Sequence, residues 1–241
     1  FQIAHVNFGL RGAESEADEL FVRQLAEKYK VPLHVGKIDT KLYAEERKLS
    51  VQVAAREWRY TWFEELLDKE LRYIVTAHHA DDNIETVVMN FFRGTGIAGL
   101  RGMLPVTGNV VRPLLPFSRN EILEFAKENN LAWREDSSNL SDKYSRNRFR
   151  HTIIPLLKEI YPEAEQNLLA NTRRFADIEN LYHQAVELHK KKLVERKGNE
   201  VHIPVLKLLK SSPAGTIVYE IVKEYGITSH QAEEVMRLLG G

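Results

Sequence analysis

The sequence predicts an α/β protein with a doubly wound parallel sheet, followed by a smaller and mostly helical domain. Short apolar, β-branched runs alternate with amphipathic segments long enough for helices, which is typical of βαβ units. Polar residues follow the apolar run Tyr73–Ala77 directly, at the carboxyl end of a strand, where open α/β sheets bind ligands. From about residue 162 onward, strand signals give way to helical ones.

The first two predicted strands are separated by a helix. Gln2–Asn7 is an apolar run that ends in a polar turn, and Leu33–Ile38 follows a proline that should end the preceding helix. Ser15 and Asp18 have the spacing of a capping box, so the helix is expected to open there and to continue to Lys30.

The third strand and its neighbouring helices form the centre of the prediction. Ser50 is a suitable N-cap for a helix at Val51–Lys69. Tyr73–Ala77 is predicted as a strand buried on both faces, and helix Asn83–Phe92 follows it. Gly94 suits the exit of that helix. The helix is expected to bury four apolar residues at helical spacing, Ile84, Val87, Val88 and Phe91.

The later elements follow from turn and cap signals. Pro113 should lie at a sheet edge or a strand end, Ser118 and Glu121 form a capping box, Pro155 should kink or divide its helix, and Gly226 should stop a helix. The expected elements are a strand at Val110–Leu114, a helix at Arg119–Asn129, a polar loop at Asp136–Asp142, a helix from Arg146 or Asn147 to Ile160, a long helix or helical pair at 163–197, an extended piece at Asn199–Ile203, and helices at Val205–Lys210, Ala214–Tyr225 and Ser229–Leu239.

The change from strand signals to helical signals near residue 162 divides the chain into two predicted domains, 1–161 and 162–241, with the boundary at about 161–175. The chain begins at Phe1, without methionine and inside a predicted strand, which suggests that an amino-terminal segment is missing. The end at Gly240-Gly241 suggests a second cut.

Bulk composition excludes several classes of protein. The 241 residues include 34 Lys+Arg and 34 Asp+Glu, so no overall field favours nucleic acid or membrane. The absence of cysteine excludes disulfides, thiolate metal sites and a thiol nucleophile in this chain. No apolar run approaches about 18 residues and no signal-peptide pattern is present, so we expect a cytoplasmic location and no membrane partner.

Two histidines and two aspartates within five residues form the most unusual cluster. One aspartate is expected to cap helix 83–92, which stabilises it by roughly 1 kcal/mol. The full set, His78, His79, Asp81 and Asp82, exceeds what a cap needs. It could hold Mg²⁺ through a carboxylate or supply an acid–base pair. A structural zinc site is disfavoured, because no second ligand pair has a suitable spacing.

Three groups of arginines are candidates for binding an anion. Arg56 and Arg59 share a helix face beside a buried stripe, a position suited to clamping an anion, although a solvated edge explains them equally well. Arg93 with Gly94 and Gly96 forms a glycine-rich loop, which a helix exit also explains. Arg146–Arg150 (RNRFR) combines phosphate donors, an amide and an aromatic ring, which favours phosphate or RNA.

As an ordered set, these motifs resemble the tRNA(Ile)-lysidine synthetase family of the PP-loop (N-type ATP pyrophosphatase) class. The resemblance extends over about Ala4–Leu157 and keeps the order and approximate spacing of the family. The matching segments are AHVNFGLRG (4–12), ESEADE (14–19), AAREWRY (54–60), TAHHADDNIET (76–86), FRGTGIAGLRGM (92–103), RPLL (112–115), EDSSN (135–139) and RNRFRHTIIPLL (146–157).

The resemblance implies a definite chemistry. ATP adenylates the C2 oxygen of the wobble cytidine in an isoleucine tRNA with a CAU anticodon, and free L-lysine then displaces AMP to form lysidine. In this reading His78 and Asp82 orient or deprotonate the lysine amine, or Asp82 holds Mg²⁺, and Arg56 or Arg59 neutralises the α-phosphate. The other implied contacts are ATP at Ala4, His5, Arg93, Gly94 and Gly96, and tRNA at Arg146, Asn147, Arg150 and the helical domain. The partners expected from this resemblance also include a possible second copy of the chain in a homodimer.

Two departures from the family pattern bear on this reading. The SGG-x-D-S phosphate loop of the family, expected before Phe1, does not occur in the sequence, and Phe8 stands where many relatives carry histidine. Three alternatives stay open. One is another PP-loop tRNA enzyme that thiolates cytidine or uridine, although those usually depend on cysteines or an iron–sulfur cluster. The others are a non-catalytic RNA-binding module and an amide-forming enzyme for a small molecule.

Overall fold

The computed structural model describes residues 1–136 and 145–240. The chain divides into two compact units, of which unit 1 comprises Phe1–Glu85 and Met103–Ile160, and unit 2 comprises Thr86–Gly102 and Tyr161–Gly241. Most of the predicted polar loop Asp136–Asp142 lies outside the described residues. No helix in the described ranges is long and apolar enough to cross a membrane.

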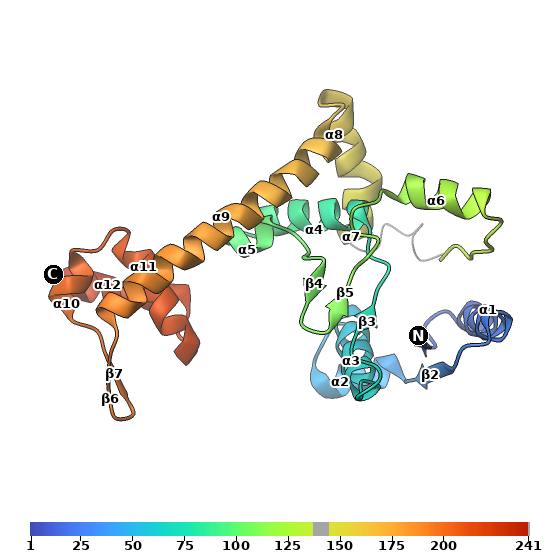
Figure 1. The fold of residues 1–241 in the computed structure, drawn as a ribbon, viewed down its shortest axis with the longest axis horizontal. Coiled ribbons are helices and arrows are strands. Elements are labelled where there is room, and N and C mark those ends of the chain that lie inside the picture. Colours follow the sequence, from blue (N-terminus) through green and yellow to red (C-terminus); the bar gives the residue numbers. More distant parts are fainter. Residues whose placement is uncertain (137–144, 241) are drawn as a thin grey trace. The chain divides into compact units, whose positions relative to one another are not determined.

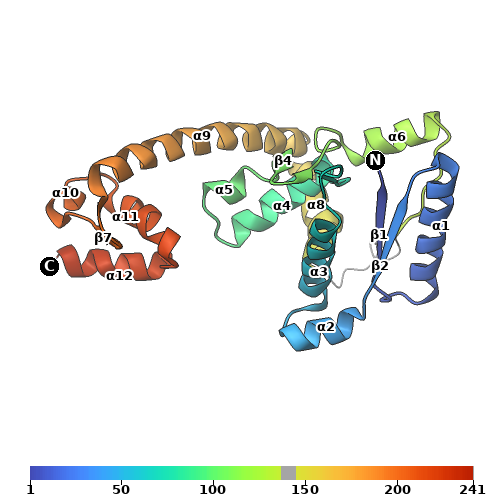
Figure 2. The ribbon, with the colours of Figure 1, turned by 60° about the horizontal axis from the view of Figure 1, so that its bottom comes forward.

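Unit 1 begins with a parallel pair of strands that has helices on both faces. β1 (Ile3–Asn7) pairs with β2 (Leu33–Lys37), and α1 (Ala13–Tyr29) connects them. Figure 2 shows α1 on one side of this pair and α3 (Val51–Glu65) on the other. Gly36 permits the close approach of α3, because a Cβ atom there would lie 2.8 Å from the Trp58 ring. This arrangement agrees with the doubly wound prediction.

The remaining strands of unit 1 form a second, smaller sheet. β3 (Ile74–Val75) pairs in parallel with β5 (Val110–Val111), and β4 (Val106–Thr107) pairs antiparallel with β5 on its other side. Among the described residues no strand joins this sheet to β1–β2, so the two parallel pairs lie in separate sheets and not in the single sheet expected. β5 is shorter than the predicted strand Val110–Leu114, and Pro113 lies two residues past its end.

Two predictions about burial in the central unit are wrong. Tyr73–Ala77 was expected to be a fully buried strand, but only two residues pair, and Tyr73 and Val75 are 62% and 68% exposed. β3 has a strand neighbour on one side only, which leaves its other side open. In α4 (Ala80–Phe92), Ile84, Val87 and Val88 are buried as expected, whereas Phe91 is 63% exposed. Burial on this helix therefore ends one turn before the helix does.

Helix caps agree with the sequence in two of three cases. The Ser50 hydroxyl accepts the Val53 N–H at 3.4 Å, and Ser118 with Glu121 forms a complete capping box for α6 (Arg119–Glu128). The capping box predicted at Ser15 is wrong, because α1 already begins at Ala13. The Ser15 hydroxyl instead accepts the N–H of Arg11, and Asp18 pairs with the Arg11 side chain at 2.6 Å.

One helix of unit 1 was not predicted, and three others differ in extent, of which α4 begins at Ala80 and not at Asn83. α2 (Thr40–Arg47) begins after Asp39, whose side chain accepts two backbone N–H groups. α3 ends at Glu65 and not at Lys69. The helix expected up to Ile160 is divided into α7 (Ser145–Arg148), a π-helical turn η2 (Phe149–Ile153) and α8 (Ile154–Ile160). The division falls immediately before Pro155, which cannot donate a backbone hydrogen bond.

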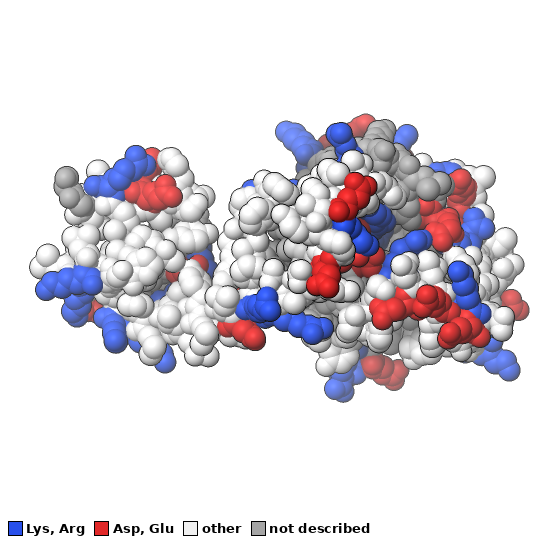
Figure 3. All heavy atoms as spheres, turned by 90° about the horizontal axis from the view of Figure 1, so that it is seen from above, with Lys and Arg blue, Asp and Glu red and all other residues white. Residues whose placement is uncertain are grey.

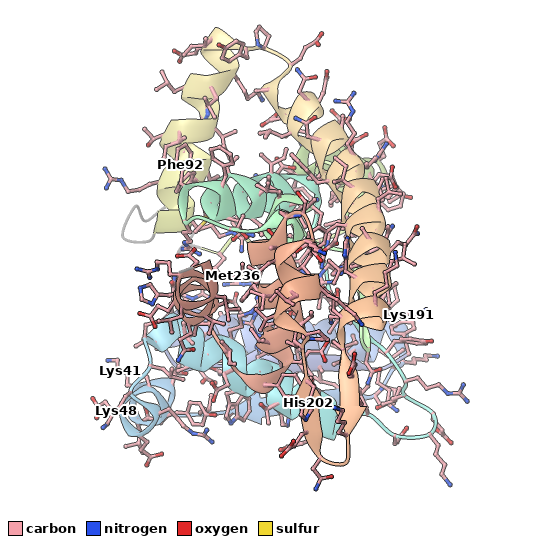
Figure 4. All side chains as sticks on the ribbon, turned by 90° about the vertical axis from the view of Figure 1, so that its left-hand side faces the viewer. Lys41, Lys48, Phe92, Lys191, His202 and Met236 are labelled. Atoms are coloured by element: carbon pink, nitrogen blue, oxygen red, sulfur yellow. The ribbon has the colours of Figure 1, made fainter. Side chains whose placement is uncertain are left out.

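Unit 2 consists of helices and one hairpin. Figure 1 shows the long helix α9 (Ala164–Leu193) with α5 (Ile97–Leu100) beside it, and the Arg101 side chain pairs with Glu179 of α9. The hairpin β6 (Glu195–Lys197) and β7 (Glu200–His202) follows α9; Figure 4 labels His202 on it and Met236 on α12. The remaining helices are α10 (Val205–Leu209), α11 (Ala214–Val222), η3 (Lys223–Tyr225) and α12 (Ser229–Gly240). The core of this unit contains Leu193, Leu208, Ile217, Val218, Ile221 and Ala232.

Two further features agree with the sequence. Gly226 has φ +78° between η3 and α12, the left-handed conformation expected of a helix stop. Figure 3 shows Lys and Arg interspersed with Asp and Glu over one face, in line with the equal numbers of the two kinds. Charge is thus mixed on this surface, and function must be sought in local clusters.

The buried carboxylate of Glu19 joins α1 to β1 and β2. It accepts hydrogen bonds from Asn7 at 2.9 Å and from Arg23 at 2.7 Å, and Lys37 lies 2.9 Å away. Hydrogen bonds from Asn7 and Lys37, opposed by the cost of burial, lower the pKa of Glu19 to about 2. Since this pKa lies below the ordinary value, the ionised form stabilises the fold above about pH 4.5, and this contribution is lost as the pH falls toward 2.

Replacing Glu19 with glutamine should therefore lower the free energy of unfolding at pH 7 by about 1–3 kcal/mol, because charged donors lose their partner. The difference from the unmodified protein should shrink between pH 4.5 and pH 2, as measured by urea unfolding at a series of pH values. Equal differences at pH 7 and pH 3 would contradict the assignment. The exposed Glu46→Gln, on α2, is the matched control.

Candidate functional site

The amino terminus of α4 is held at the carboxyl end of β3 by backbone and side-chain hydrogen bonds. The Ala80 N–H donates to the Phe117 carbonyl at 2.8 Å. Asp81 accepts the Arg119 N–H at 2.9 Å, and Asp82 accepts the His79 N–H at 3.1 Å. Asp82 therefore closes the first turn, as a capping residue at the third helical position does. Its cap role uses only one of its two oxygens.

The other oxygen of Asp82 belongs to a four-charge cluster, which consists of Asp82, Glu85, Arg146 and Arg150. Glu85 is only 1% exposed. Its two oxygens accept the Arg146 Nε–H at 2.6 Å and the Arg150 Nε–H at 2.5 Å. The Asp82 Oδ1 atom lies 3.2 Å from Arg146 Nη2 and 3.3 Å from Arg150 Nη2. Two carboxylates and two guanidinium groups balance, so the cluster as a whole is neutral.

The local helix geometry explains how the sequence brings these groups together. Asp82 and Glu85 are three residues apart, so they lie on one face of α4. Arg146 lies in α7 and Arg150 in the π turn η2, four positions later and on the same side. Asn147 between them is buried. The RNRFR run therefore turns two of its arginines toward α4.

His78 lies beside this cluster in an environment that keeps it neutral. Its Nδ1 atom is 2.9 Å from the Thr76 hydroxyl. Burial lowers the pKa of His78, and the positive charges of Arg112, Arg146 and Arg56 lower it further, against the opposing charge of Asp82. At neutral pH the ring is therefore unprotonated and can accept a proton. A neutral imidazole at the end of a strand suits a general base.

His79 lies within ion-pair distance of both aspartates. Its Nδ1 atom lies 3.4 Å from Asp81 and its Nε2 atom 3.4 Å from Asp82. The interaction with His79, opposed by burial, lowers the pKa of Asp81 to about 2. Asp81 thus stays ionised at any pH near neutrality, and serves to anchor the start of α6 through the Arg119 N–H.

The two arginines predicted on α3 have different surroundings. The Arg59 guanidinium lies 4.9 Å from the centre of the Phe8 ring, and its burial lowers its pKa. Arg56 lies 4.9 Å from the centre of the Tyr60 ring and, with Arg112, lines an open depression of about 440 Å³. Phe8 therefore serves as a stacking surface for the Arg59 cation, although Arg59 as a whole is exposed.

The residues predicted to contact the nucleotide are distributed over both units. In β1, Ala4 is exposed, whereas the His5 Nε2 atom is buried without a hydrogen-bond partner among the described residues, and burial lowers the pKa of His5. Arg93, Gly94 and Gly96 belong to unit 2 and are exposed, and Gly94 has φ +74° at the exit of α4.

A second depression, of about 560 Å³, lies at the carboxyl ends of the parallel pair β1–β2. This is the edge at which α/β sheets bind ligands. Its lining residues include Asn7, Phe8, Lys37 and Thr40.

Asp82 does not fit a magnesium ligand in this arrangement. Its two oxygens already accept the His79 N–H and contact two guanidinium groups. Mg²⁺ prefers carboxylates together with water and phosphate oxygens, and two adjacent cations oppose it. The described residues also contain no group of three or more His, Asp or Glu side chains that could hold a metal ion.

Sequence reasoning missed two residues of this site. Glu85 was treated as part of a helix, although its spacing of three from Asp82 placed both acids on one helix face. Arg112 was included in a predicted strand and in the matching segment RPLL (112–115), but no role was assigned to it. Its role depends on burial beside α3, which only the folded chain reveals.

Comparisons with known proteins agree with this architecture. Residues 1–157 match the model of the PP-loop domain, and residues 195–241 match the TilS substrate binding domain. The chain also resembles a solved structure, the U34-tRNA thiolase NcsA from Methanococcus maripaludis with its [4Fe-4S] cluster, with a TM-score of 0.52 at 20% identity. That likeness covers 73% of this chain and 61% of the thiolase chain, and shows the fold alone.

Curated relatives narrow the family. A tRNA(Ile)-lysidine synthase from Parabacteroides distasonis is 41% identical over 98% of this chain and 53% of its own length. One from Bacteroides thetaiotaomicron is 37% identical over 100% of this chain and 56% of its own length. A third, from Chlorobaculum tepidum, is 36% identical over 94% of this chain and 70% of its own length. The chain spans about half the length of the first two relatives. The chain belongs to the tRNA(Ile)-lysidine synthase family of PP-loop proteins.

Proposed function

We propose that the protein containing this chain ligates lysine to C2 of the wobble cytidine in an isoleucine tRNA with a CAU anticodon, at the expense of ATP. The observation that carries this proposal is the four-charge cluster beside a neutral His78, in a chain of the tRNA(Ile)-lysidine synthase family. ATP use is in line with the match to the PP-loop domain. No step of the proposal depends on Mg²⁺.

The cluster suits free lysine because lysine carries charges of both signs. Its α-ammonium group is attracted by Asp82 and Glu85, and its carboxylate by Arg146 and Arg150. The cluster is neutral before binding, so these two groups of lysine, one of each sign, can exchange with the existing ion pairs and leave the charges balanced, while the ε-nitrogen takes no part in the exchange. A ligand with a single charge would leave a buried charge of the cluster without its partner.

His78 is the residue best placed to activate the amine. Once the cytidine C2 oxygen has attacked the α-phosphorus of ATP and pyrophosphate has left, the C2–O–AMP bond holds a good leaving group. The lysine ε-nitrogen then attacks C2 with its lone pair, the C2–O bond breaks, and AMP departs with the bonding electrons. The proton lost by the nitrogen passes to the unprotonated ring of His78.

Recognition of the tRNA forms the remainder of the proposal. The match of residues 195–241 to the TilS substrate binding domain supports a role in tRNA binding for the predicted domain 162–241. The RNA contacts expected of Arg146, Asn147 and Arg150 stay a prediction, since both guanidinium groups are engaged by carboxylates and Asn147 is buried. The homodimer and the cytoplasmic location also stay predictions.

The full-length protein, given ATP, Mg²⁺, lysine and tRNA with a CAU anticodon, should convert one cytidine to lysidine. Mass spectrometry of nuclease digests measures this conversion, and the reaction without lysine is the control. A sulfur-containing nucleoside would indicate the thiolation alternative, which the absence of cysteine from this chain disfavours. Unmodified cytidine throughout would refute the proposal.

Replacing Glu85 with glutamine should raise the KM for lysine at least about tenfold, because a hydrogen bond between charged groups contributes about 1.5–3 kcal/mol. The KM values for ATP and tRNA should change little, as measured in steady-state assays of lysidine formation. Glu46→Gln, an exposed change on α2, is the control. A lowered melting temperature is expected in any case, but parallel increases in all three KM values would assign Glu85 to stability alone.

A further inference from the structure

A buried arginine with an unused donor lines the depression beside α3. Arg112 is 8% exposed and lies one residue beyond β5. Its Nη1 atom donates to the Leu104 carbonyl at 2.8 Å and to the Thr107 hydroxyl at 3.1 Å. Its Nε atom is buried and has no hydrogen-bond partner among the described residues. Buried donors are nearly always satisfied, so the free Nε–H indicates that a further group binds here.

Apart from Arg112, the lining of this depression comes from α3. Arg56 stacks there on Tyr60, with 4.9 Å between the guanidinium carbon and the ring centre. The depression, of about 440 Å³, thus combines two guanidinium groups with an aromatic ring. Its lining residues are Val53, Arg56, Glu57, Tyr60, Thr61, Glu64 and Arg112.

The charge of these two arginines is not compensated in the way that the four-charge cluster is. Neither Arg56 nor Arg112 forms an ion pair within the described part of the chain, whereas Arg146 and Arg150 each pair with Glu85. Glu57 is engaged elsewhere, with the Tyr43 hydroxyl at 3.0 Å and Arg47 at 3.7 Å. Glu64 remains as an acceptor on the wall, which favours a ligand that carries hydrogen-bond donors as well as negative charge.

We propose that Arg112 and Arg56 form a binding site for the phosphate group of a nucleotide, with Tyr60 available to stack on its base. Arginine suits phosphate because its planar donors match two oxygens at once. The proposal rests on the proposed function, which supplies two sources of such a group. One is the adenylate made from ATP, and the other is a nucleotide of the RNA next to the reactive cytidine.

The two arginines of this site also affect the pKa of His78, the candidate base. After burial, the charges of Arg112, Arg146 and Arg56 are the causes that lower the pKa of His78. The depression and the imidazole therefore share one electrostatic environment. A phosphate held by Arg112 would therefore act on the pKa of the group that takes the proton from the amine.

The test compares ligands with and without phosphate on the full-length protein. Isothermal titration calorimetry gives the affinities for AMP and adenosine, and filter binding gives the salt dependence for an anticodon stem-loop RNA. If the phosphate is that of the adenylate, the ratio of AMP affinity to adenosine affinity should fall about tenfold in the Arg112→Gln protein. Its affinity for adenosine should stay unchanged. If it belongs to the RNA, the salt slope should fall by about one phosphate contact.

Further variants guard against loss of folding. Arg112→Lys keeps the charge and a donor for the Leu104 carbonyl but loses the Nε–H, so it should show a smaller version of the same loss. Arg56→Gln should give a similar loss, and the double variant should lose less than the sum of the single changes, because both arginines hold one group. The exposed Arg72→Gln, which does not line the depression, is the matched control.

The outcomes separate this inference from the proposed function. Folded Arg112→Lys and Arg56→Gln proteins that keep both the AMP preference and the RNA salt slope would overturn the phosphate site. A protein that forms no lysidine, yet loses its AMP preference on Arg112→Gln, would retain the phosphate site and refute the proposed reaction.

Discussion

The buried carboxylate of Glu85 constrains much of unit 1. An ionised carboxylate that is 1% exposed is tolerated only when charged donors surround it. Arg146 and Arg150 supply those donors from 61 and 65 residues further along the chain. The carboxylate thereby fixes the helical segment that follows residue 145 against α4. Removing one member of such a buried set typically costs roughly 3–5 kcal/mol, because the remaining charge stays buried.

The π turn in that helical segment has a physical cause in the sequence. Pro155 has no N–H, so a regular helix would lose one hydrogen bond at this point. In the structure the Ile154 N–H donates to the Phe149 carbonyl, five residues earlier, as in a π helix. Arg150 lies within this turn and Arg146 immediately before it. The irregular turn and the charge cluster therefore occur together, as is common where helices carry functional side chains.

The sequence predicts those parts of the fold that depend on local chemistry. The Ser118–Glu121 capping box, the left-handed Gly226 and the division before Pro155 all follow from a few neighbouring residues. Other errors arise where contacts between distant segments determine the structure. Tyr73–Ala77 has the composition of a fully buried strand, but among the residues that the structure describes β3 pairs only with β5 and so has a strand neighbour on one side alone.

The same distinction applies to the site. The cluster at His78–Asp82 was apparent from the sequence, as four ionisable residues within five positions, and the structure places it at the start of α4. The partners of Asp82 were not apparent, because Arg146 and Arg150 suggest RNA binding when they are considered as a basic run. Only the ion pairs with Glu85, 61 and 65 residues earlier in the chain, show that these two guanidinium groups already have partners within the protein, although the Arg146 side chain is still 39% exposed. Charge counted along the sequence is thus a poor guide to the charge that a ligand meets.

Two kinds of charge arrangement surround His78, and they have different consequences for catalysis. The four-charge cluster is neutral and can exchange ion pairs with a ligand that carries both signs. Arg56 and Arg112 are uncompensated within the described residues and lower the pKa of His78. A phosphate bound between them would offset their charge and so remove that part of the effect. The pKa of His78 would then rise by that part, while burial and Arg146 would continue to lower it, and proton removal would be favoured when the phosphate-bearing substrate is present.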